Sequence, residues 1–345
     1  MTTTSRIAPR ATIGDTVIDP APIYDAATAF WKSAVLFAAC RLGVFDALDQ
    51  PAGAAALAQR LDLSERGTEA LLEACVAMGL LEKEGDTYRN TPASERYLTS
   101  RSPESLLVTL ELQAATYPMW MHLCEAVRKG QPVMPPRDLL GGHQELTRQF
   151  VVGMHQRALG TAAALMDAVD LTGHRVLADI GGGPGTYSML MLQRYPGLRA
   201  RIMDLAPILD VARTLVASSG VGDRIEMVPF DATADDLGNG FDAALVSGLL
   251  HRMTAETSRS ILRKVYAGMA PGGLIAVNDL FTVRGGPAMA VLFGLQMLLT
   301  NETGGAHEAS DVASWLAQAG FVDVRITESV PHTVVIARKA AAIRS

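Results

Sequence analysis

The chain has 345 residues, of which 49% are hydrophobic, and its formal net charge is −6. This length allows two domains with sizeable cores, and the acidic balance disfavours a nucleic-acid partner, since such proteins usually present a basic surface. Cys40, Cys75 and Cys124 form no Cys-x-x-Cys pair, which disfavours a zinc knuckle or a disulfide framework and favours the reducing cytoplasm.

Residues 1–20 show no periodicity and no secretory signal, and we expect a flexible arm there. From Tyr24 to Leu48, apolar residues recur at helical spacing on more than one face, which predicts helices that are buried on several sides. The longest uncharged apolar stretch, residues 285–300, is shorter than the ~20 residues that a membrane-spanning helix needs, so we expect no membrane partner.

Residues 53–98 have the order of a winged helix. A helix is predicted over 54–61, a second over 65–78 with Ser64 as its N-cap, and a hairpin with a Gly-Asp turn over 80–89. The second helix, where DNA recognition would occur, carries three glutamates and a single arginine, so a polyanion would be repelled. We therefore expect this fold to serve dimerisation.

Residues 103–170 read as helices interrupted by a loop at 130–142 that contains Pro132, Pro135 and Pro136. The region is rich in methionine and aromatic residues, which are most often plain core but can line an apolar pocket. The candidate pocket residues here and further along the chain are Trp120, Phe150, Met154, Met297 and Asn301.

Beyond residue 174, strand and helix patterns alternate. Parallel strands are predicted over 175–180, 199–204, 224–229, 241–247 and 273–278, and a closing antiparallel hairpin over 322–328 and 332–338. This order predicts a Rossmann-like α/β domain.

A glycine loop follows the first of these strands. Asp179 precedes glycines at 181, 183 and 185, whereas the dinucleotide fingerprint would need a glycine where Thr186 stands. A glycine floor lets a flat or zwitterionic ligand lie against the backbone, and Asp179 can orient the loop or hold an ammonium group. Asp204 ends the next strand, where a carboxylate can accept from both hydroxyls of a ribose.

These features resemble the S-adenosylmethionine (SAM) site of class I methyltransferases, and residues 22–339 resemble the plant caffeate and hydroxyindole O-methyltransferase family with its bacterial natural-product relatives. The matching segments include Asp179 to Gly185, Leu249-Leu250-His251, Pro271-Gly272-Gly273, Thr303-Gly304-Gly305 and Trp315 to Phe321. The resemblance implies a winged-helix dimerisation domain over 21–100, a helical pocket-lining region over 101–172, a SAM-binding domain over 173–340, and a homodimer.

The resemblance also implies which residues hold the cofactor SAM. Gly181 and Gly183 fall on the glycines that face its amino-acid moiety, Asp204 on the ribose acid, Asp231 on the acid that holds the adenine amino group, and Ser247 and Gly248 on groups near the carboxylate. Asp179, Leu205 and Ala232 are further candidate cofactor residues. The family usually has Gly-Asp where this chain has Phe230-Asp231.

His251 falls on the general base of the family, and Asp279 and His307 fall on or beside its orienting acids. The family's His-Asp-Trp is His251-Arg252-Met253 here, and its second acid falls on His307 or, with a register shift of one residue, on Glu308. If His251, Asp279 and His307 converged, they would form a ligand set suited to non-haem iron. We expect that these residues bind no metal and that His251 is a base held by hydrogen bonds.

The resulting hypothesis is SAM-dependent methyl transfer to a hydroxyl of a small aromatic or polyketide-like molecule. Two alternatives on the same scaffold are methyl transfer to carbon or nitrogen, and a reaction other than methylation, such as hydroxylation or rearrangement. A ligand-sensing winged-helix regulator is the alternative from another class.

Overall fold

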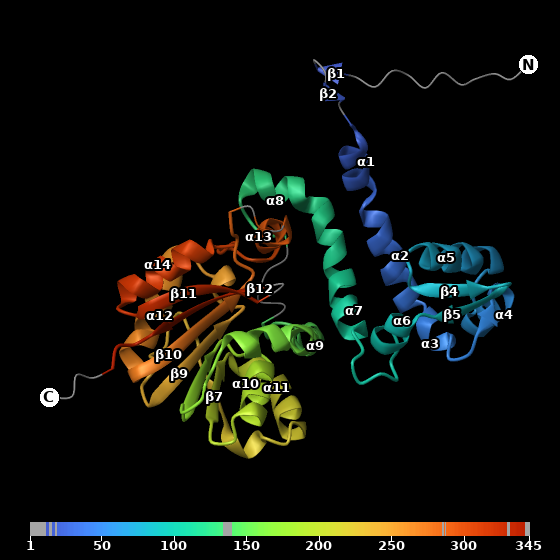
Figure 1. Cartoon of the computed structure of the whole chain (residues 1–345). Coiled ribbons are helices and arrows are strands. Elements are labelled where there is room, and N and C mark those ends of the chain that lie inside the picture. The colour runs from blue at the N-terminus through green and yellow to red at the C-terminus, as the bar shows by residue number, and fades with distance from the viewer. Residues whose placement is uncertain are drawn as a thin grey trace, which may run out of the picture. The chain divides into compact units, whose positions relative to one another are not determined.

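The computed structural model describes residues 12–13, 16–17, 19–133, 140–284, 286, 288–329 and 332–341. Most of the predicted arm, the prolines at 135 and 136 and the turn residue Pro331 lie outside these ranges. The chain forms two compact units, residues 1–107 and residues 108–345 (Figure 1). None of the described helices combines the length and the apolar character that crossing a membrane would require.

The first unit is mostly helical and carries a small β-wing. Its elements are β1 (Thr12–Ile13), β2 (Thr16–Val17), α1 (Ala21–Thr28), α2 (Phe30–Arg41), α3 (Val44–Ala47), β3 (Ala52–Gly53), α4 (Ala54–Leu61), α5 (Glu65–Ala77), β4 (Leu81–Glu84), β5 (Thr87–Asn90) and α6 (Pro92–Tyr97). The side chain of Ser64 accepts a hydrogen bond from the Gly67 amide at 3.2 Å and so caps α5 as predicted. The β4–β5 hairpin turns at Gly85, whose φ is 58°.

The predicted burial of the first two helices on several sides is wrong for the single chain. Helix α1 has no buried residue and α2 buries Ala39, while Tyr24 and Trp31 are 68% and 60% exposed. The apolar side chains of this segment are therefore largely exposed to solvent in the described part of the single chain.

The second unit begins with helices and continues as an α/β layer structure. Its helical elements are α7 (Leu107–Thr116), η1 (Tyr117–His122), α8 (Leu123–Lys129), α9 (Gln144–Ala168), α10 (Thr186–Arg194), α11 (Ala206–Ser218), η3 (Gly222–Arg224), η4 (Leu250–Arg252), α12 (Ala255–Gly268), α13 (Ala288–Thr300) and α14 (Ala309–Ala319). Its strands are β6 (Val176–Ile180), β7 (Arg199–Asp204), β8 (Ile225–Pro229), β9 (Phe241–Ser247), β10 (Met269–Asp279), β11 (Val322–Ser329) and β12 (His332–Arg338).

All seven strands form one sheet in the order β11-β12-β10-β9-β6-β7-β8. The five strands from β6 to β10 are parallel, and β12 runs antiparallel to both of its neighbours, so the predicted sheet with a terminal hairpin is confirmed. The chain passes from β6 to β7 on one side and later to β9 on the other. The carboxyl end of β6 is therefore a topological switch point, where α/β sheets bind their ligands.

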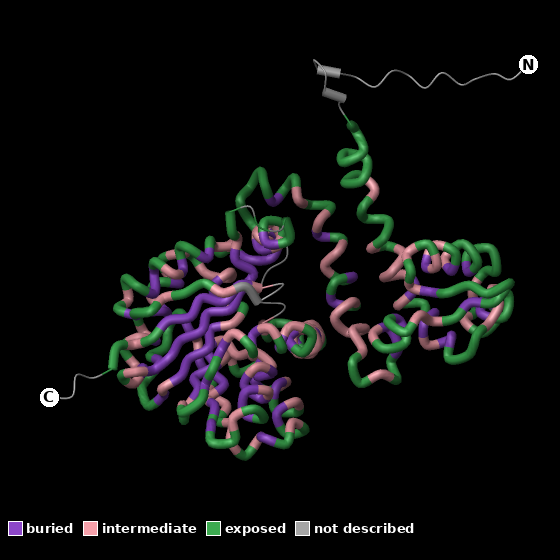
Figure 2. The backbone as a smooth tube through the Cα atoms, viewed as in Figure 1, coloured by how far each residue is buried: buried purple, intermediate pink, exposed green. Residues whose placement is uncertain are grey.

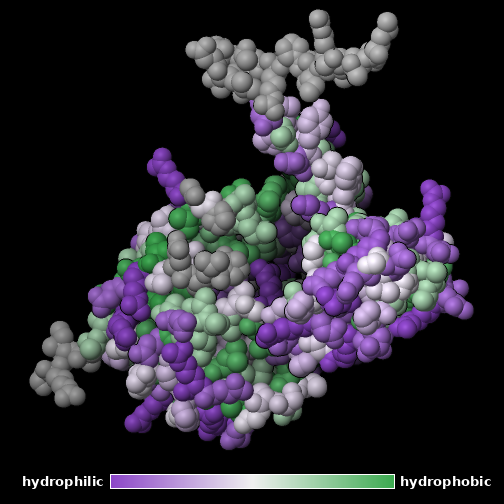
Figure 3. Space-filling model, turned by 45° about the vertical axis from the view of Figure 1, so that its right-hand side comes forward, coloured by the Kyte–Doolittle hydropathy of each residue, from purple (hydrophilic) through white to green (hydrophobic). Residues whose placement is uncertain are grey.

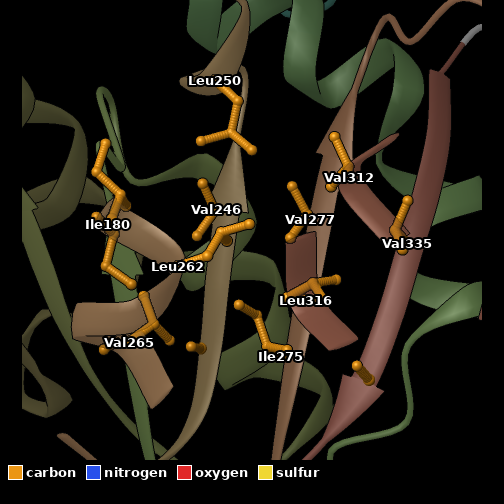
Figure 4. Packing of buried hydrophobic residues seen from close by; sticks show 14 of the residues in the cluster. Ile180, Val246, Leu250, Leu262, Val265, Ile275, Val277, Val312, Leu316 and Val335 are labelled. Atoms are coloured by element: carbon orange, nitrogen blue, oxygen red, sulfur yellow. The ribbon is translucent and has the colours of Figure 1, made fainter. Parts of the chain in front are cut away.

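Two apolar layers hold this sheet, whose strands are largely buried along their length (Figure 2). On one face, α12 and α14 pack through residues such as Leu262 and Leu316 against Val246 and Val277 of the sheet (Figure 4). On the other face, α9, α10 and α11 pack against the same strands. The strand ends that carry the candidate site are thus fixed from both sides.

Candidate functional site

The glycine loop links β6 to α10 and is folded around its neighbours. Gly181, Gly183 and Gly185 have φ values of 67°, 55° and 73°, which side chains rarely adopt. A Cβ on Gly182 would lie 2.8 Å from Asp179 Cγ, whereas one on Gly183 would meet nothing within 4 Å. Gly182 therefore serves close packing, and Gly183 presents open backbone on which a ligand can lie.

Asp179 is a buried carboxylate beneath this loop, 2% exposed. Its Oδ2 accepts a hydrogen bond from Ser188 Oγ at 2.6 Å. Burial raises the pKa of Asp179 to about 7 against the opposing effect of the Ser188 hydrogen bond, and the charge of Asp204 adds to the rise. Among the described residues no cation pairs with it, so a positively charged ligand nearby would favour its ionised form.

Asp204 ends β7 and joins the loop to the next helix. Its Oδ2 accepts from the Gly183 amide and its Oδ1 from the Leu205 amide, both at 2.7 Å. Burial raises the pKa of Asp204, while these two amides and the charge of Arg252 oppose the rise. Each oxygen retains a second lone pair, so the fixed carboxylate can still accept from a diol.

Two further predicted cofactor residues follow β8. Asp231 Oδ1 accepts from the Thr233 amide at 2.8 Å and from its hydroxyl at 2.6 Å, and these bonds lower the pKa of Asp231. Phe230, the residue that departs from the family pattern, is 7% exposed and belongs to the core with Ala232. The Phe230 side chain therefore fills the core, and the Asp231 carboxylate lies just beyond the end of β8.

Ser247 and Gly248 lie at the end of β9. Asn278 of the neighbouring strand donates to Ser247 Oγ at 2.9 Å, and its carbonyl accepts from the Gly248 amide at 2.9 Å. Gly248 has a φ of 65°, and a Cβ there would lie 3.7 Å from His251 Cε1. The edge of the His251 ring thus lies beside Gly248.

His251 and Asp279 form a close pair at the ends of β9 and β10. His251 Nδ1 lies 2.7 Å from Asp279 Oδ1, and the Asp279 side chain is 3% exposed. Burial alone would raise the pKa of Asp279, but the charge of His251 and the hydrogen bonds from His251 and Leu280 outweigh it and hold the pKa below its ordinary value. The ionised carboxylate can only accept, so Nδ1 carries the proton, and Nε2 has no hydrogen-bond partner among the described residues.

The structure does not bring His307 to this pair. His307 Nε2 lies 3.0 Å from the Leu250 carbonyl and 3.1 Å from the Met253 carbonyl, and its ring packs edge-on against Trp315. Glu308 is exposed and accepts from Ser310. Within the part of the chain that the structure describes, no three His, Cys, Asp or Glu side chains could hold a metal ion together.

His307 instead braces the backbone of the His251 loop, together with Gly304 and Gly305. The Gly305 amide donates to the His251 carbonyl at 2.9 Å, and a Cβ on Gly304 would lie 2.8 Å from the Arg252 carbonyl carbon. Only glycine fits so close to that backbone. This segment therefore holds the backbone of residues 250–253 in place next to Asp279.

The predicted pocket residues come from three helical elements. Phe150 and Met154 are half-buried on α9, and Trp120 is half-buried in η1. Met297 and Asn301 are 6% and 7% exposed, and Asn301 Nδ2 lies 3.2 Å from Met297 Sδ. The guanidinium carbon of Arg252 lies 5.8 Å from the Phe150 ring centroid, so α9 and the His251 loop face each other.

Sequence reasoning missed Phe293 and Arg157. The Phe293 ring of α13 packs edge-on against His251, with centroids 4.9 Å apart, and the Arg157 guanidinium lies 6.0 Å from the same ring. Arg157 follows Phe150 and Met154 by seven and three residues on α9, which places it on their face of the helix. That spacing was the available signal.

Comparisons with known proteins agree with this geometry. The model of the O-methyltransferase dimerisation domain matches residues 24–100, and that of the O-methyltransferase domain matches residues 120–322. The 3-hydroxy-5-methyl-1-naphthoate 3-O-methyltransferase of Streptomyces sahachiroi is 33% identical over 89% of this chain and 90% of its own length. The tetracenomycin polyketide synthesis 8-O-methyl transferase of Streptomyces glaucescens is 32% identical over 93% of this chain and 97% of its own length.

A solved structure of human N-acetylserotonin methyltransferase in complex with SAM superposes with a TM-score of 0.85 at 28% identity, covering 95% of this chain and all of that one. A solved structure of PigF with S-adenosylhomocysteine (SAH) gives 0.82 at 29% identity, over 93% of this chain and all of that one. The chain therefore belongs to the O-methyltransferase family and is a SAM-dependent O-methyltransferase with an α/β methyltransferase domain.

Proposed function

We propose that the protein methylates a hydroxyl of a small aromatic or polyketide-like molecule, with His251 as the general base. The observation that carries this proposal is the His251–Asp279 pair, whose 2.7 Å bond fixes the tautomer with a free Nε2. Relatives named for a naphthoate and a polyketide substrate support the choice of acceptor class.

The residues at the sheet edge fit the cofactor. The glycine loop at Gly181 and Gly183 would carry its amino-acid moiety above Asp179, with open backbone at Gly183, and Asp204 with Leu205 would hold the ribose. Asp231 and Ala232 would face the adenine, and Ser247 and Gly248 the carboxylate. When bound, SAM supplies an electrophilic methyl group on a sulfonium sulfur.

His251 would act on the acceptor. A phenolic hydroxyl has a pKa near ~10 and is a weak nucleophile while protonated, whereas a neutral imidazole nitrogen can take its proton as the oxygen attacks. Asp279 holds the ring and stabilises the imidazolium that forms, because its carboxylate is ionised and buried. Phe293 limits rotation of the ring from the other side.

The apolar pocket would hold the acceptor against this base. We assign Phe150, Met154 and Trp120 to one wall, and Met297 with Asn301 to another. The contact of Arg252 with Phe150 supports this assignment because it joins α9 to the His251 loop.

We propose that residues 21–100, within the first unit, pair with a second copy to form a homodimer. The family match of residues 24–100 supports this assignment, as do the exposed apolar side chains of α1 and α2, including Ile23, Tyr24, Phe30 and Trp31. The face of the wing and its neighbouring helices seen in Figure 3 is mainly hydrophilic, so the apolar residues of α1 and α2 are the better candidates for a protein contact.

Calorimetric titration with SAH and a radiolabelled methyl-transfer assay test the proposal. We expect micromolar SAH binding to the natural protein and to His251→Ala, and turnover of phenolic acceptors that falls by ~10²–10⁴ in the variant. Near-normal turnover of His251→Ala would eliminate the general-base role, and absence of SAH binding at millimolar ligand would contradict the site.

A further inference from the structure

One face of α9 combines apolar and cationic side chains beside the catalytic pair. Phe150, Met154 and Arg157 are spaced four and three residues apart, so they lie along a single face of the helix. The Arg157 guanidinium and the His251 imidazole both contact the ring of Phe293, at 6.0 and 4.9 Å between centres. This cation and the proposed base therefore contact the same phenyl ring.

The Arg157 guanidinium lacks a partner among the described residues. No hydrogen bond or ion pair reaches its nitrogen atoms from any described group, although it is half-buried and can donate five hydrogen bonds. Arg224, by contrast, donates to four backbone carbonyls. Burial lowers the pKa of Arg157, and the charges of Tyr187 and Asp279 oppose this effect. The side chain remains a cation, with unused donors.

The groups around Arg157 leave its charge available. Asp279 is the nearby anion, and it is already bound to His251 and to two backbone amides. The neighbouring His332 is neutral at physiological pH, since burial and the charge of Arg157 lower its pKa to about 4. The cluster thus holds one satisfied anion and one unsatisfied cation, and an incoming anion would complete it.

We propose that Arg157 binds a carboxylate of the acceptor, so that the substrate class is hydroxyaryl carboxylates rather than neutral phenols. A planar guanidinium matches a planar carboxylate through two parallel hydrogen bonds. With the carboxylate on Arg157 and the aromatic ring against Phe293, a hydroxyl on the same acceptor can face His251. This inference rests on the proposed function and adds the identity of the second polar group on the acceptor.

Binding of matched acceptors tests the inference without turnover. The full-length protein is saturated with SAH and titrated with 2-naphthol, and separately with 3-hydroxy-2-naphthoate and 6-hydroxy-2-naphthoate, which add a carboxylate at two positions. We expect at least one hydroxynaphthoate to bind about 10–100-fold more tightly than 2-naphthol, as befits hydrogen bonds between charged groups in a half-buried site. Arg157→Met should abolish this preference and leave SAH affinity within about twofold.

Arg194→Met is the matched control. Arg194 also lies over an aromatic ring, that of Tyr195, but it stands at the end of α10 remote from the glycine loop. This variant should retain the preference for the hydroxynaphthoate.

Three results would overturn the inference. Equal loss of both acceptors in Arg157→Met would mean that Arg157 acts on the shared hydroxyl or on the ring, and loss of SAH affinity would mean that it holds the carboxylate of the cofactor. A natural protein that binds and methylates 2-naphthol as well as the hydroxynaphthoates would refute the inference alone. Failure to bind SAH, or failure to methylate any hydroxyl acceptor, would instead refute the proposed function.

Discussion

Replacing Asp279 with asparagine tests whether the His251–Asp279 pair works as a catalytic unit. The carboxylate accepts three hydrogen bonds, from His251 Nδ1 at 2.7 Å, the Leu280 amide at 2.8 Å and the His251 amide at 3.3 Å. An asparagine keeps the shape but offers one oxygen and one amide group. Its amide must therefore face either the His251 backbone donor or His251 Nδ1.

Either arrangement has a measurable cost. If the asparagine amide donates to Nδ1, the imidazole proton moves to Nε2 and the free base is lost. If it faces the His251 amide, two donors oppose each other in a buried site. We expect turnover to fall by ~10²–10⁴, which is about 3–5 kcal/mol in the barrier, and the free energy of unfolding to fall by about 1.5–3 kcal/mol.

The assay pairs initial rates of methyl transfer with SAH titration and thermal melting. Asp242→Asn is a suitable control, because Asp242 also accepts from backbone amides, those of Arg175 and Val176, but at the opposite end of the sheet. A Tm drop in Asp279→Asn with a rate within threefold of the natural protein would refute the reasoning, since the pair would then only stabilise the fold.

Three further predictions concern the cofactor site, the brace and the first unit. Asp204→Ala should weaken SAH binding at least tenfold, because the ribose and two backbone amides lose their acceptor, and calorimetry giving unchanged affinity would exclude the ribose role. Gly304→Ala should slow turnover at least tenfold with SAH affinity retained, because the added Cβ would collide with the backbone of the His251 loop; a rate equal to that of Gly305→Ala, where a Cβ has open space, would contradict the bracing role. Light scattering should give the mass of a dimer, and Trp31→Glu should shift it towards the monomer; a natural protein that is monomeric at micromolar concentration would exclude the homodimer.

The strands and the sheet edge that carries the candidate site were predictable because their signals are local. Apolar runs that end in an acid or a glycine mark β6 and β7, and the parallel order then brings Asp179 and Asp204 to the same edge. The helix cap at Ser64 and the wing turn at Gly85 follow from short sequence patterns in the same way.

The surroundings of His251 were not predictable because they depend on packing between distant segments. His307 matches a catalytic position in sequence, yet its ring turns to the Leu250 and Met253 carbonyls, which accept its proton. The spacing along α9 places Arg157 on the face of Phe150, but its contact with Phe293 of α13 depends on packing between the two helices, which no local pattern encodes. The uncovered faces of α1 and α2 mislead for a similar reason, since an apolar pattern does not say whether the chain itself or a partner buries it.

One buried and one half-buried group at the site give the ligand-free protein opposite responses to pH. Asp179 has a folded pKa of about 7, above its ordinary 3.8, so the folded state holds the extra proton in this window and stability falls as pH rises through it. His332 has a folded pKa of about 4, below its ordinary 6.5, so the unfolded state takes up the extra proton and stability falls as pH drops from about 6.5 to 4. The contribution of each group to the free energy of unfolding changes by about 2 kcal/mol between pH 7 and pH 5, and because the two changes have opposite signs they nearly cancel.

The cancellation can be separated by mutation. Relative to the natural protein, the His332→Gln variant should become more stable as the pH is lowered from 7 to 5. The Asp179→Asn variant should instead become more stable, relative to the natural protein, as the pH is raised from 5 to 7. Asp179→Asn should also bind SAH more weakly if the Asp179 carboxylate pairs with the ammonium group of the ligand. If the Tm of all three proteins changed with pH in the same way between pH 5 and 7, both assignments would be contradicted. A more stable Asp179→Asn with unchanged SAH affinity would show that this carboxylate only shapes the glycine loop.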